Sequence, residues 1–375
     1  MRTVEELRRW RVEAIPFWTE RAWDAQRGGF YESLDLTGRP IEQESRRVRV
    51  QARQIYSFAV CSERKWADTL DLAESGWAFL IDRASHPDGG FVHRLTADGD
   101  VESDIRDLYD HAFLLLAVAT LWRVTGKPDY EAECARLAEF IGVRMAHPEL
   151  GFVESLGGSV SPRRQNPHMH LFEALMVYHQ AGGEQALDQA RKLKDMFLKH
   201  FFSQESSKLF EFFEDDLKTV CANTGPVAEP GHLAEWVWLL DQFARLDGSS
   251  LGPEVRSLFD CVLDQGVNPT TGLLYATLSE DGRPMNAESR TWMQTEWVRA
   301  AAVGLNRGFD RAELAFEAAA QGLISHHFAD VPSGGWQDRI DAKGAASMDR
   351  MPASTLYHVI GALIEADKFL DSDPC

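Results

Sequence analysis

Histidines and carboxylates recur on apolar segments of this sequence at spacings that could support acid–base chemistry. In "EPGHLAEWVWLL" (229–240), His232 and Glu235 are three residues apart and therefore share one side of a helix. Burying an imidazole beside a carboxylate is costly unless each group has a partner or a function. Imidazole titrates near pH 6.5, at about neutral pH, so it can both take and return a proton. We expect Glu235 to orient His232 and to hold it protonated.

Five other apolar segments carry one polar or aromatic side chain at a corresponding place. They contribute Arg53, Tyr109, His170, Trp292 and His358. A lone histidine on an apolar face is usually a core residue, but three histidines at matching places indicate a shared pocket. Arg53 would stabilise negative charge developing on a substrate oxygen. The set favours proton transfer beside a carbonyl over glycoside hydrolysis, which uses two carboxylic acids.

Neighbouring residues leave alternatives open. Arg49 lies four residues before Arg53, on a run that is too apolar for a solvated face. Tyr109 is either a core tyrosine with a bonded hydroxyl or a pocket residue. Asn166, followed by proline, is either a helix N-cap or a pocket residue, and His170 is the better functional candidate.

The segment "SRTWMQTEWVRAA" offers an aromatic wall. Trp292 is either plain core or a flat indole that stacks on a sugar ring, and Gln294 and Glu296 lie beside it. Ligand-like spacings occur at His232/Glu235 and at His168/His170, but they match no specific metal signature. The sequence therefore predicts no metal and no other cofactor.

A short glycine and aromatic motif followed by a polar hairpin-like stretch recurs six times. Its key residues are Phe30, Phe91, Phe152, Phe210, Leu273 and Trp336, at intervals of 61, 61, 58, 63 and 63 residues. Each unit is interpreted as a hairpin followed by two helices, the first buried all round and the second half-exposed. The expected inner helices are 48–62, 107–123, 168–180, 231–245, 290–304 and 354–367. The expected outer helices are 3–23, 68–83, 129–145, 184–200, 254–265 and 311–327.

This repeat predicts an all-α fold. The expected architecture is an (α/α)6 barrel, or toroid, of six helix-pair repeats with short β-hairpin loops at one end. No linker breaks the chain, so we expect a single catalytic domain over residues 1–375. A linear helical solenoid is the alternative, but it would lack the hairpins. Parallel inner helices that start at one end would bring the six polar positions into one pocket.

Composition limits the partners. The formal net charge of −19 disfavours nucleic acid. An anionic substrate would need a local basic cluster, and "RRVRVQAR" (46–53) is the one candidate. Five separated cysteines (Cys61, Cys134, Cys221, Cys261 and Cys375) are expected to be free thiols in a reducing compartment. With no signal peptide and no apolar run of membrane-spanning length, we expect a cytoplasmic protein that binds no membrane. The sequence leaves open a monomer or a homo-oligomer.

Five motifs, in order, resemble the N-acylglucosamine 2-epimerase superfamily, and within it the bacterial D-mannose isomerases. They are "RVQARQIYSFA", "NPHMHLFEAL", "EPGHLAEWVWLL", "RTWMQTEWVRA" and "ASTLYHV". The resemblance implies an (α/α)6 barrel without a metal, in which His232 and His358 are the catalytic pair with Glu235 beside His232. It implies that Arg53 binds substrate oxygens near the reacting carbons. It assigns sugar binding to Tyr109, Asn166 and His170, and an aromatic wall to Trp292 with Gln294 and Glu296 near it.

The expected function is an aldose–ketose isomerase that interconverts D-mannose and D-fructose through a cis-enediolate, with D-lyxose as a further candidate substrate. The alternatives are a 2-epimerase of N-acylglucosamine or cellobiose type, a sulfoquinovose isomerase whose sulfonate site only Arg49 and its neighbours could supply, and a non-catalytic sugar- or protein-binding relative. The context of His358, "ASTLY" (353–357), favours the isomerase. We expect Thr355 and Leu356 to crowd the pocket mouth and to favour a free monosaccharide.

Overall fold

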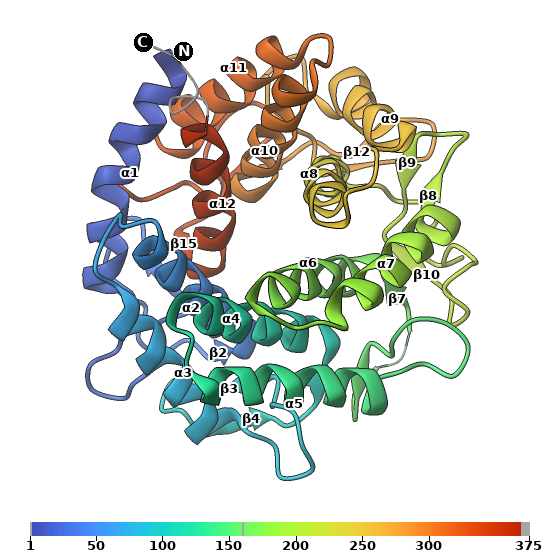
Figure 1. The fold of residues 1–375 in the computed structure, drawn as a ribbon. Helices are drawn as coiled ribbons and strands as arrows, with labels where there is room; N and C mark the ends of the chain where they lie inside the picture. Colours follow the sequence, from blue (N-terminus) through green and yellow to red (C-terminus); the bar gives the residue numbers. More distant parts are fainter. Residues whose placement is uncertain (1, 160, 369–375) are drawn as a thin grey trace.

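Two concentric rings of helices make up the molecule (Figure 1). The computed structural model describes residues 2–159 and 161–368. Within them, α2, α4, α6, α8, α10 and α12 form the inner ring, and each contacts the next, with α12 returning to α2. The remaining helices pack outside them, and α1 lies against α11 and α12. The fold is the expected (α/α)6 barrel.

The bounds of the helices agree with the expected ones to within a few residues. The inner helices are α2 (Val48–Glu63), α4 (Leu108–Thr125), α6 (Gln165–Ala181), α8 (Pro230–Asp247), α10 (Thr291–Arg307) and α12 (Leu356–Asp367). The outer helices are α1 (Arg2–Arg21), α3 (Leu70–Ala84), α5 (Pro128–Arg144), α7 (Ala186–Met196), α9 (Pro253–Cys261) and α11 (Ala312–Gly322). Helices α7, α9 and α11 each end in a π-helical turn, at Phe197–Phe201, Val262–Gly266 and Leu323–His327, and a 3₁₀ turn (Ala353–Thr355) precedes α12.

Local sequence explains where these helices start and stop. The Asp107 carboxylate caps α4 by accepting hydrogen bonds from the amides of Tyr109 and Asp110. Helices α5, α8 and α9 begin with proline, whose missing N–H is not needed in the first turn. Left-handed glycines follow α4, α8 and α10, at Gly126, Gly248 and Gly308.

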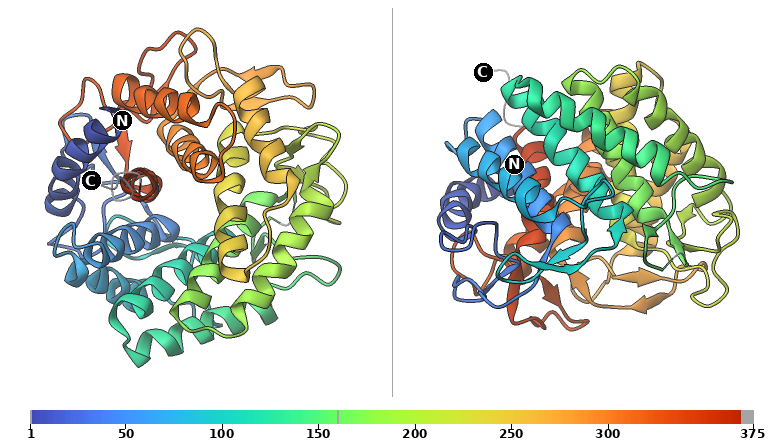
Figure 2. Two further views of the ribbon diagram at one scale, coloured as in Figure 1. Left: turned by 45° about the horizontal axis from the view of Figure 1, so that its top comes forward. Right: turned by 90° about the horizontal axis from the view of Figure 1, so that it is seen from below.

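Short antiparallel strands connect each outer helix to the following inner helix, and they lie at the end of the barrel where the inner helices begin (Figure 2). The strands are β1 (Ser33–Asp35), β2 (Arg46–Arg47), β3 (Arg94–Leu95), β4 (Val101–Ser103), β5 (Arg106–Asp107), β6 (Ser155–Leu156), β7 (Arg163–Arg164), β8 (Phe202–Ser203), β9 (Lys208–Leu209), β10 (Phe212–Phe213), β11 (Thr277–Leu278), β12 (Pro284–Asn286), β13 (Ser289–Arg290), β14 (Arg339–Ile340) and β15 (Arg350–Pro352). Strand β1 pairs with β15, so the first hairpin closes the ring against the last repeat.

The register of the repeat differs from the expected one in two copies. In every repeat, one backbone amide of the motif donates a hydrogen bond to a backbone carbonyl at the end of the preceding outer helix. The donors are the amides of Tyr31, Val92, Val153, Phe210, Tyr275 and Gln337. The apolar key residue is the one before it, buried in five repeats and partly buried at Phe152. In repeats four and five the key residues are therefore Leu209 and Leu274, and the predicted Phe210 and Leu273 are wrong by one position. Two apolar residues are adjacent in each of these motifs, so the sequence alone did not distinguish them.

The structure also bears on the expectations about membrane spans and cysteines. In the part of the chain that the structure describes, no helix is long and apolar enough to cross a membrane. Cys61, Cys134, Cys221 and Cys261 are buried free thiols, and Cys375 lies outside the described residues.

Candidate active site

Two layers of side chains surround the axis of the barrel at the hairpin end. The first-turn amides of Val48, Leu108, Gln165, Thr291 and Ala353 donate to equivalent hairpin carbonyls, which sets five inner helices at one height. One residue after these amides come Arg49, Tyr109, Asn166, Trp292 and Ser354. Five residues after them come Arg53, Phe113, His170, Glu296 and His358. The second set lies one helical turn deeper, a rise of about 6 Å.

The expected common depth therefore holds for Arg53, His170 and His358 but is wrong for Tyr109 and Trp292, which lie one turn nearer the mouth. Helix α8 lacks the anchoring amide because it starts at Pro230. It contributes His232 between the two layers.

These layers enclose a cavity of about 260 Å³. That volume is near the small end of the roughly 300–1,000 Å³ range of ligand pockets, which suits a monosaccharide. Its lining consists of Arg47, Arg49, Arg53, Tyr109, Asn166, His170, Glu229, His232, Glu235, Arg290, Trp292, Ser354, Thr355 and His358. Nine of the eleven residues expected at the site line it, and Gln294 and Glu296 do not.

His232 is held by a carboxylate that the sequence interpretation missed. Its Nδ1 lies 2.9 Å from Glu211 Oε1, and Glu229 Oε2 is 3.5 Å away. The second oxygen of the Glu211 carboxylate accepts a hydrogen bond from the side-chain amide of Gln165 at 3.0 Å, so both carboxylate oxygens are held. Burial alone would lower the pKa of His232, but Glu211 and then Glu229 outweigh it and raise the pKa to about 10. His232 is therefore a cation at neutral pH.

The side-chain amide of Asn166 faces His232, with its nitrogen 3.1 Å from Nε2. A cationic imidazole donates from both nitrogens, so it needs an acceptor at this place. Turning the amide by half a turn puts the Asn166 oxygen there, which otherwise has no partner among the described residues. Because α6 starts at Gln165, Asn166 lies within the helix and is not its N-cap.

His358 has the opposite surroundings. Its Nδ1 lies 2.7 Å from Glu296 Oε1, and two hydrogen bonds from Arg299, at 3.0 and 2.8 Å, fix that carboxyl group. Burial and the charge of Arg53 hold the pKa of His358 well below its ordinary value. The ring is therefore neutral, with its proton on Nδ1 toward Glu296 and a lone pair on Nε2. A neutral imidazole that lines a cavity in this tautomer can act as a base.

Trp292 connects the two histidines. Its ring centroid lies 4.9 Å from that of His232 and 5.5 Å from that of His358. One indole thus lies between a cationic and a neutral imidazole in the same cavity. Environments that push two pKa values apart in this way identify an acid and a base.

Glu235 does not contact His232 Nδ1 as expected. It is fully buried, and its nearest histidine nitrogen is His170 Nδ1, at 3.9 Å. Neither carboxyl oxygen has a hydrogen-bond partner among the described residues. Burial and the nearby Glu296 raise the pKa of Glu235 well above its ordinary value, so it is a neutral acid in the cavity wall. The three-residue spacing predicted the wrong partner, because the nearest carboxylate to His232 Nδ1 is Glu211 of the hairpin, whereas Glu235 lies beside His170.

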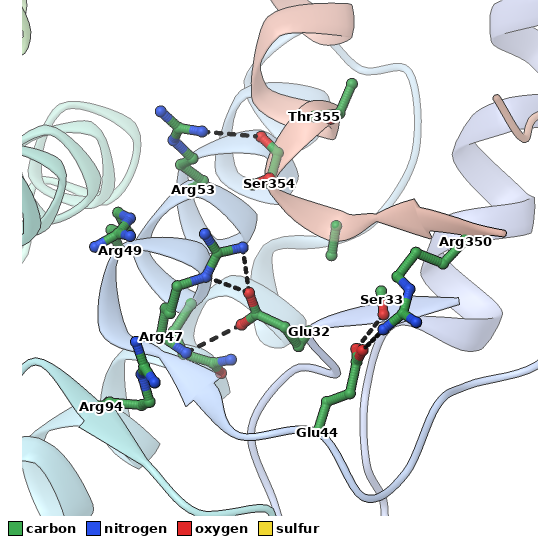
Figure 3. Close-up of polar contacts among 12 residues, drawn as sticks. Glu32, Ser33, Glu44, Arg47, Arg49, Arg53, Arg94, Arg350, Ser354 and Thr355 are labelled. Atoms are coloured by element: carbon green, nitrogen blue, oxygen red, sulfur yellow. Dashed lines mark hydrogen bonds and ion pairs between the residues drawn. The ribbon is translucent and has the colours of Figure 1, made fainter. Parts of the chain in front are cut away.

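Among the residues that the structure describes, no carboxylate forms an ion pair with Arg53. Its Nη1 lies 3.4 Å from the Ser354 carbonyl (Figure 3). Its Nη2 donates to the Tyr109 hydroxyl at 2.6 Å, and its guanidinium lies 4.1 Å above the Phe113 ring. Arg49 donates to Asp110 at 3.0 Å. Arg53 is thus placed to meet a negative oxygen at the depth of His358.

Three expected residues have supporting positions. Gln294 is buried and donates to Ser289, away from the cavity. Glu296 does not line the cavity and instead contacts Nδ1 of His358. Leu356 is buried in the core and does not line the cavity, whereas Thr355 lines it and donates to Asp338 at 2.9 Å. The expectation that Leu356 crowds the mouth is therefore wrong.

Glu211 escaped notice because of the shifted register. Counted from Leu209, it is the second residue after the key position, as are Glu32, Glu154 and Asp338 in their own repeats. Acidic residues at that place in four repeats are the signal that could have found it.

Comparisons with known proteins give consistent results. The family model of N-acylglucosamine 2-epimerase (GlcNAc 2-epimerase) matches residues 29–362. A Rhizobium meliloti (strain 1021) protein named mannose-6-phosphate isomerase is 34% identical over 378 residues, covering 97% of each chain. The D-mannose isomerase of Thermobifida fusca is 26% identical and covers 85% of this chain and 87% of its own.

A structural neighbour supports the architecture. Cellobiose 2-epimerase from Bacillus thermoamylovorans B4167 has a TM-score of 0.86 at 18% identity, covering 98% of this chain and 100% of that chain. At that identity the likeness shows the fold alone.

Proposed function

The chain belongs to the N-acylglucosamine 2-epimerase family, and on this premise we propose that it is an aldose–ketose isomerase interconverting D-mannose and D-fructose. The same chemistry would serve D-lyxose and D-xylulose. The observation that carries the proposal is the pair His232 and His358, which line one cavity in opposite protonation states beside Trp292. The names of the two isomerase relatives support the choice of mannose.

Ring opening comes first. The ring oxygen of the bound sugar replaces the Asn166 oxygen as the acceptor of His232 Nε2, and the cationic imidazole donates that proton to it. A solvent water takes the proton of the O1 hydroxyl while the C1–O5 bond breaks, which leaves an aldehyde. Glu211 retains its hydrogen bond to Nδ1 throughout, so the imidazole stays oriented. The indole of Trp292 offers a flat surface for the sugar.

Proton transfer follows in the floor of the cavity. The His358 Nε2 lone pair takes the proton from C2, and the C–H electrons form the C1–C2 double bond of an enediolate. Arg53 faces the developing negative charge on oxygen. His358 then returns the proton to C1 while the O2 proton moves to O1, which gives the ketose. Glu296 accepts a hydrogen bond from Nδ1 and stabilises the imidazolium formed between the two steps.

Product analysis with D-mannose in heavy water tests this function. We expect fructose to accumulate first and glucose to appear slowly if at all. Deuterium should enter C1 only in turnovers in which the proton held by His358 exchanges with solvent before it returns. No conversion of any free aldose would overturn the proposal.

A 2-epimerase is the second candidate, because His232 and His358 come from different helices and could serve opposite faces of an enediolate. Cationic His232 would supply the proton on the opposite face, so the protonation states of the two histidines suit both reactions, and the names of the two isomerase relatives favour reprotonation at C1. Faster conversion of N-acetylmannosamine or cellobiose than of mannose would establish the epimerase instead.

A further inference from the structure

Four arginines line the cavity of a protein whose formal net charge is −19. They are Arg47, Arg49, Arg53 and Arg290. The acidic lining residues are only Glu229 and Glu235. A neutral monosaccharide does not require this excess of cations, whereas a cleft of one sign attracts a ligand of the opposite charge.

The carboxylates that pair with three of these arginines lie behind the lining. Glu32 contacts Arg47, Asp110 contacts Arg49 and Asp338 contacts Arg290. Their side chains are 10%, 0% and 0% exposed, whereas those of the arginines are 33%, 19% and 35% exposed. The acids therefore orient the guanidinium groups without screening them from the cavity.

Donors remain unused on the cavity side. Arg47 engages Glu32 through its Nε and Nη2 and through its backbone amide. Among residues 2–159 and 161–368, no acceptor lies within hydrogen-bond distance of its Nη1. Arg49 uses only Nη1, toward Asp110. A guanidinium has five N–H donors, so both side chains keep donors for a ligand.

The arginines follow one another along the start of α2, as the side chains of Arg47, Arg49 and Arg53 in Figure 3 show. Arg47 precedes the helix, Arg49 is in its first turn, and Arg53 lies one turn deeper, at the depth of His358. Four helical residues rise about 6 Å, comparable with an extended six-carbon chain. A sugar whose C1 and C2 meet Arg53 and His358 would thus extend its far end toward Arg47 and Arg49.

We propose that Arg47 and Arg49 bind an anionic phosphoryl group at the end of the sugar remote from C1 and C2, so that the preferred substrate is a hexose 6-phosphate. This proposal rests on the proposed isomerase function and specifies its substrate class. Arginine forks match the geometry of phosphate oxygens and form charge-assisted hydrogen bonds with them.

Arg164 occupies the position equivalent to Arg47 in another repeat and serves as a comparison for a purely structural role. Arg164 makes the same contacts to Glu154, from its backbone amide and its Nε, both at 2.7 Å, and its side chain is 35% exposed. Arg164 does not line the cavity. Arg164→Gln therefore removes the same clamp without touching the proposed anion site.

The experiment measures kcat/KM for D-mannose 6-phosphate and for D-mannose in the wild type, Arg47→Gln, Arg47→Lys and Arg164→Gln. Inorganic phosphate is tested as a competitive inhibitor of mannose turnover by the wild type. We expect the wild type to prefer the phosphate ester at least about tenfold, as one or two charge-assisted bonds provide. That preference should fall about tenfold or more in Arg47→Gln, fall less in Arg47→Lys, and stay within about twofold in Arg164→Gln.

Each other outcome has a distinct meaning. Turnover of mannose with no preference for its phosphate, and no inhibition by phosphate, would overturn the anion site and leave the isomerase function standing. An equal loss of preference in both glutamine variants would overturn the assignment to Arg47. If Arg47→Gln fails to fold, Arg47→Lys and phosphate inhibition of the wild type still decide. Conversion of neither sugar would overturn the isomerase function and, with it, this proposal.

Discussion

His232 and His358 reach opposite protonation states because of what faces each ring. Two carboxyl groups, Glu211 and Glu229, raise the pKa of His232, whereas burial and the charge of Arg53 lower the pKa of His358. Burial strengthens both influences by lowering the local dielectric.

Replacing His358 by Ala should remove the base and lower turnover of mannose at least about 100-fold, the usual scale for a lost acid–base group. Exchange of the C2 proton with solvent, followed by NMR, should fall in parallel. His86→Ala, which removes an imidazole far from the cavity, is the control. Near-normal exchange in His358→Ala would contradict its role.

Replacing Glu211 by Gln should move the alkaline limb of the pH–rate profile to lower pH. The carboxylate raises the pKa of His232 to about 10, so its loss lowers that pKa, and the acid deprotonates earlier as pH rises. Glu214→Gln, in the same hairpin without contact to His232, should leave the limb in place. An unchanged limb in Glu211→Gln would show that His232 is not the titrating acid.

The same pKa predicts the pH dependence of stability. The folded value, about 10, exceeds the unfolded value of about 6.5, so protonated His232 stabilises the fold fully below pH 6.5. This contribution should disappear as pH rises from about 6.5 to 10. Urea unfolding across that range should show a smaller loss of stability in Glu211→Gln than in the wild type.

Metal independence stays a prediction. His170, Glu173 and Glu235 offer ligand atoms within 4.8 Å of one another, as do Glu235, Glu296 and His358. The acid–base set is nevertheless complete without an ion. Dialysis against a strong chelator should therefore leave activity unchanged, and a loss that zinc or manganese restores would refute this.

Nine cavity residues were predictable because polar groups on otherwise apolar helices indicate a pocket. The hydrogen-bond partners of these residues were not predictable. The pairing of His232 with Glu211 depends on a hairpin register that two neighbouring apolar residues obscured. Helical spacing placed Glu235 on the side of His232, but spacing does not report where a side chain points.

At the scale of elements, helices were predictable to a few residues because inner and outer helices differ in how much apolar surface they bury. The π-helical turns that end α7, α9 and α11 were not, since they arise where the helices meet the hairpins. The common height of the inner helices also depends on hydrogen bonds between elements, which sequence periodicity does not report.

The docking of α1 onto the sixth repeat depends on Gly334. Its φ is +92°, and a Cβ there would lie 2.6 Å from Ala14 Cα in α1. Gly272, with φ of +71°, has nothing within 4 Å. Gly272→Ala should cost about 1 kcal/mol of stability from backbone strain. Gly334→Ala should lower the melting temperature clearly more, because a backbone must also move, and equal shifts would contradict this packing.

At the scale of the whole molecule, the ring has no unique starting repeat. Asp367 in α12 forms ion pairs with Arg8 and Arg11 of α1, so the two ends of the described chain lie together. A circular permutant cut between Ser249 and Ser250, in an exposed loop, with residues 375 and 1 joined by a linker, should fold and keep activity within about tenfold. The same cut without the linker is the control. A permutant that unfolds in two separate transitions would contradict the single domain expected from the sequence.

The pairing of β1 with β15 has a consequence for biosynthesis. The two strands are 315 residues apart, from Asp35 to Arg350. A ribosome adds about 5–20 residues per second, so β1 stays unpaired for roughly 15–60 s before β15 has been synthesised. During that time Arg53 has emerged but His358 has not, and no nascent chain has a complete catalytic floor. A growing polypeptide with an open strand edge exposes unpaired backbone groups, and the catalytic floor is complete only after α12 has emerged.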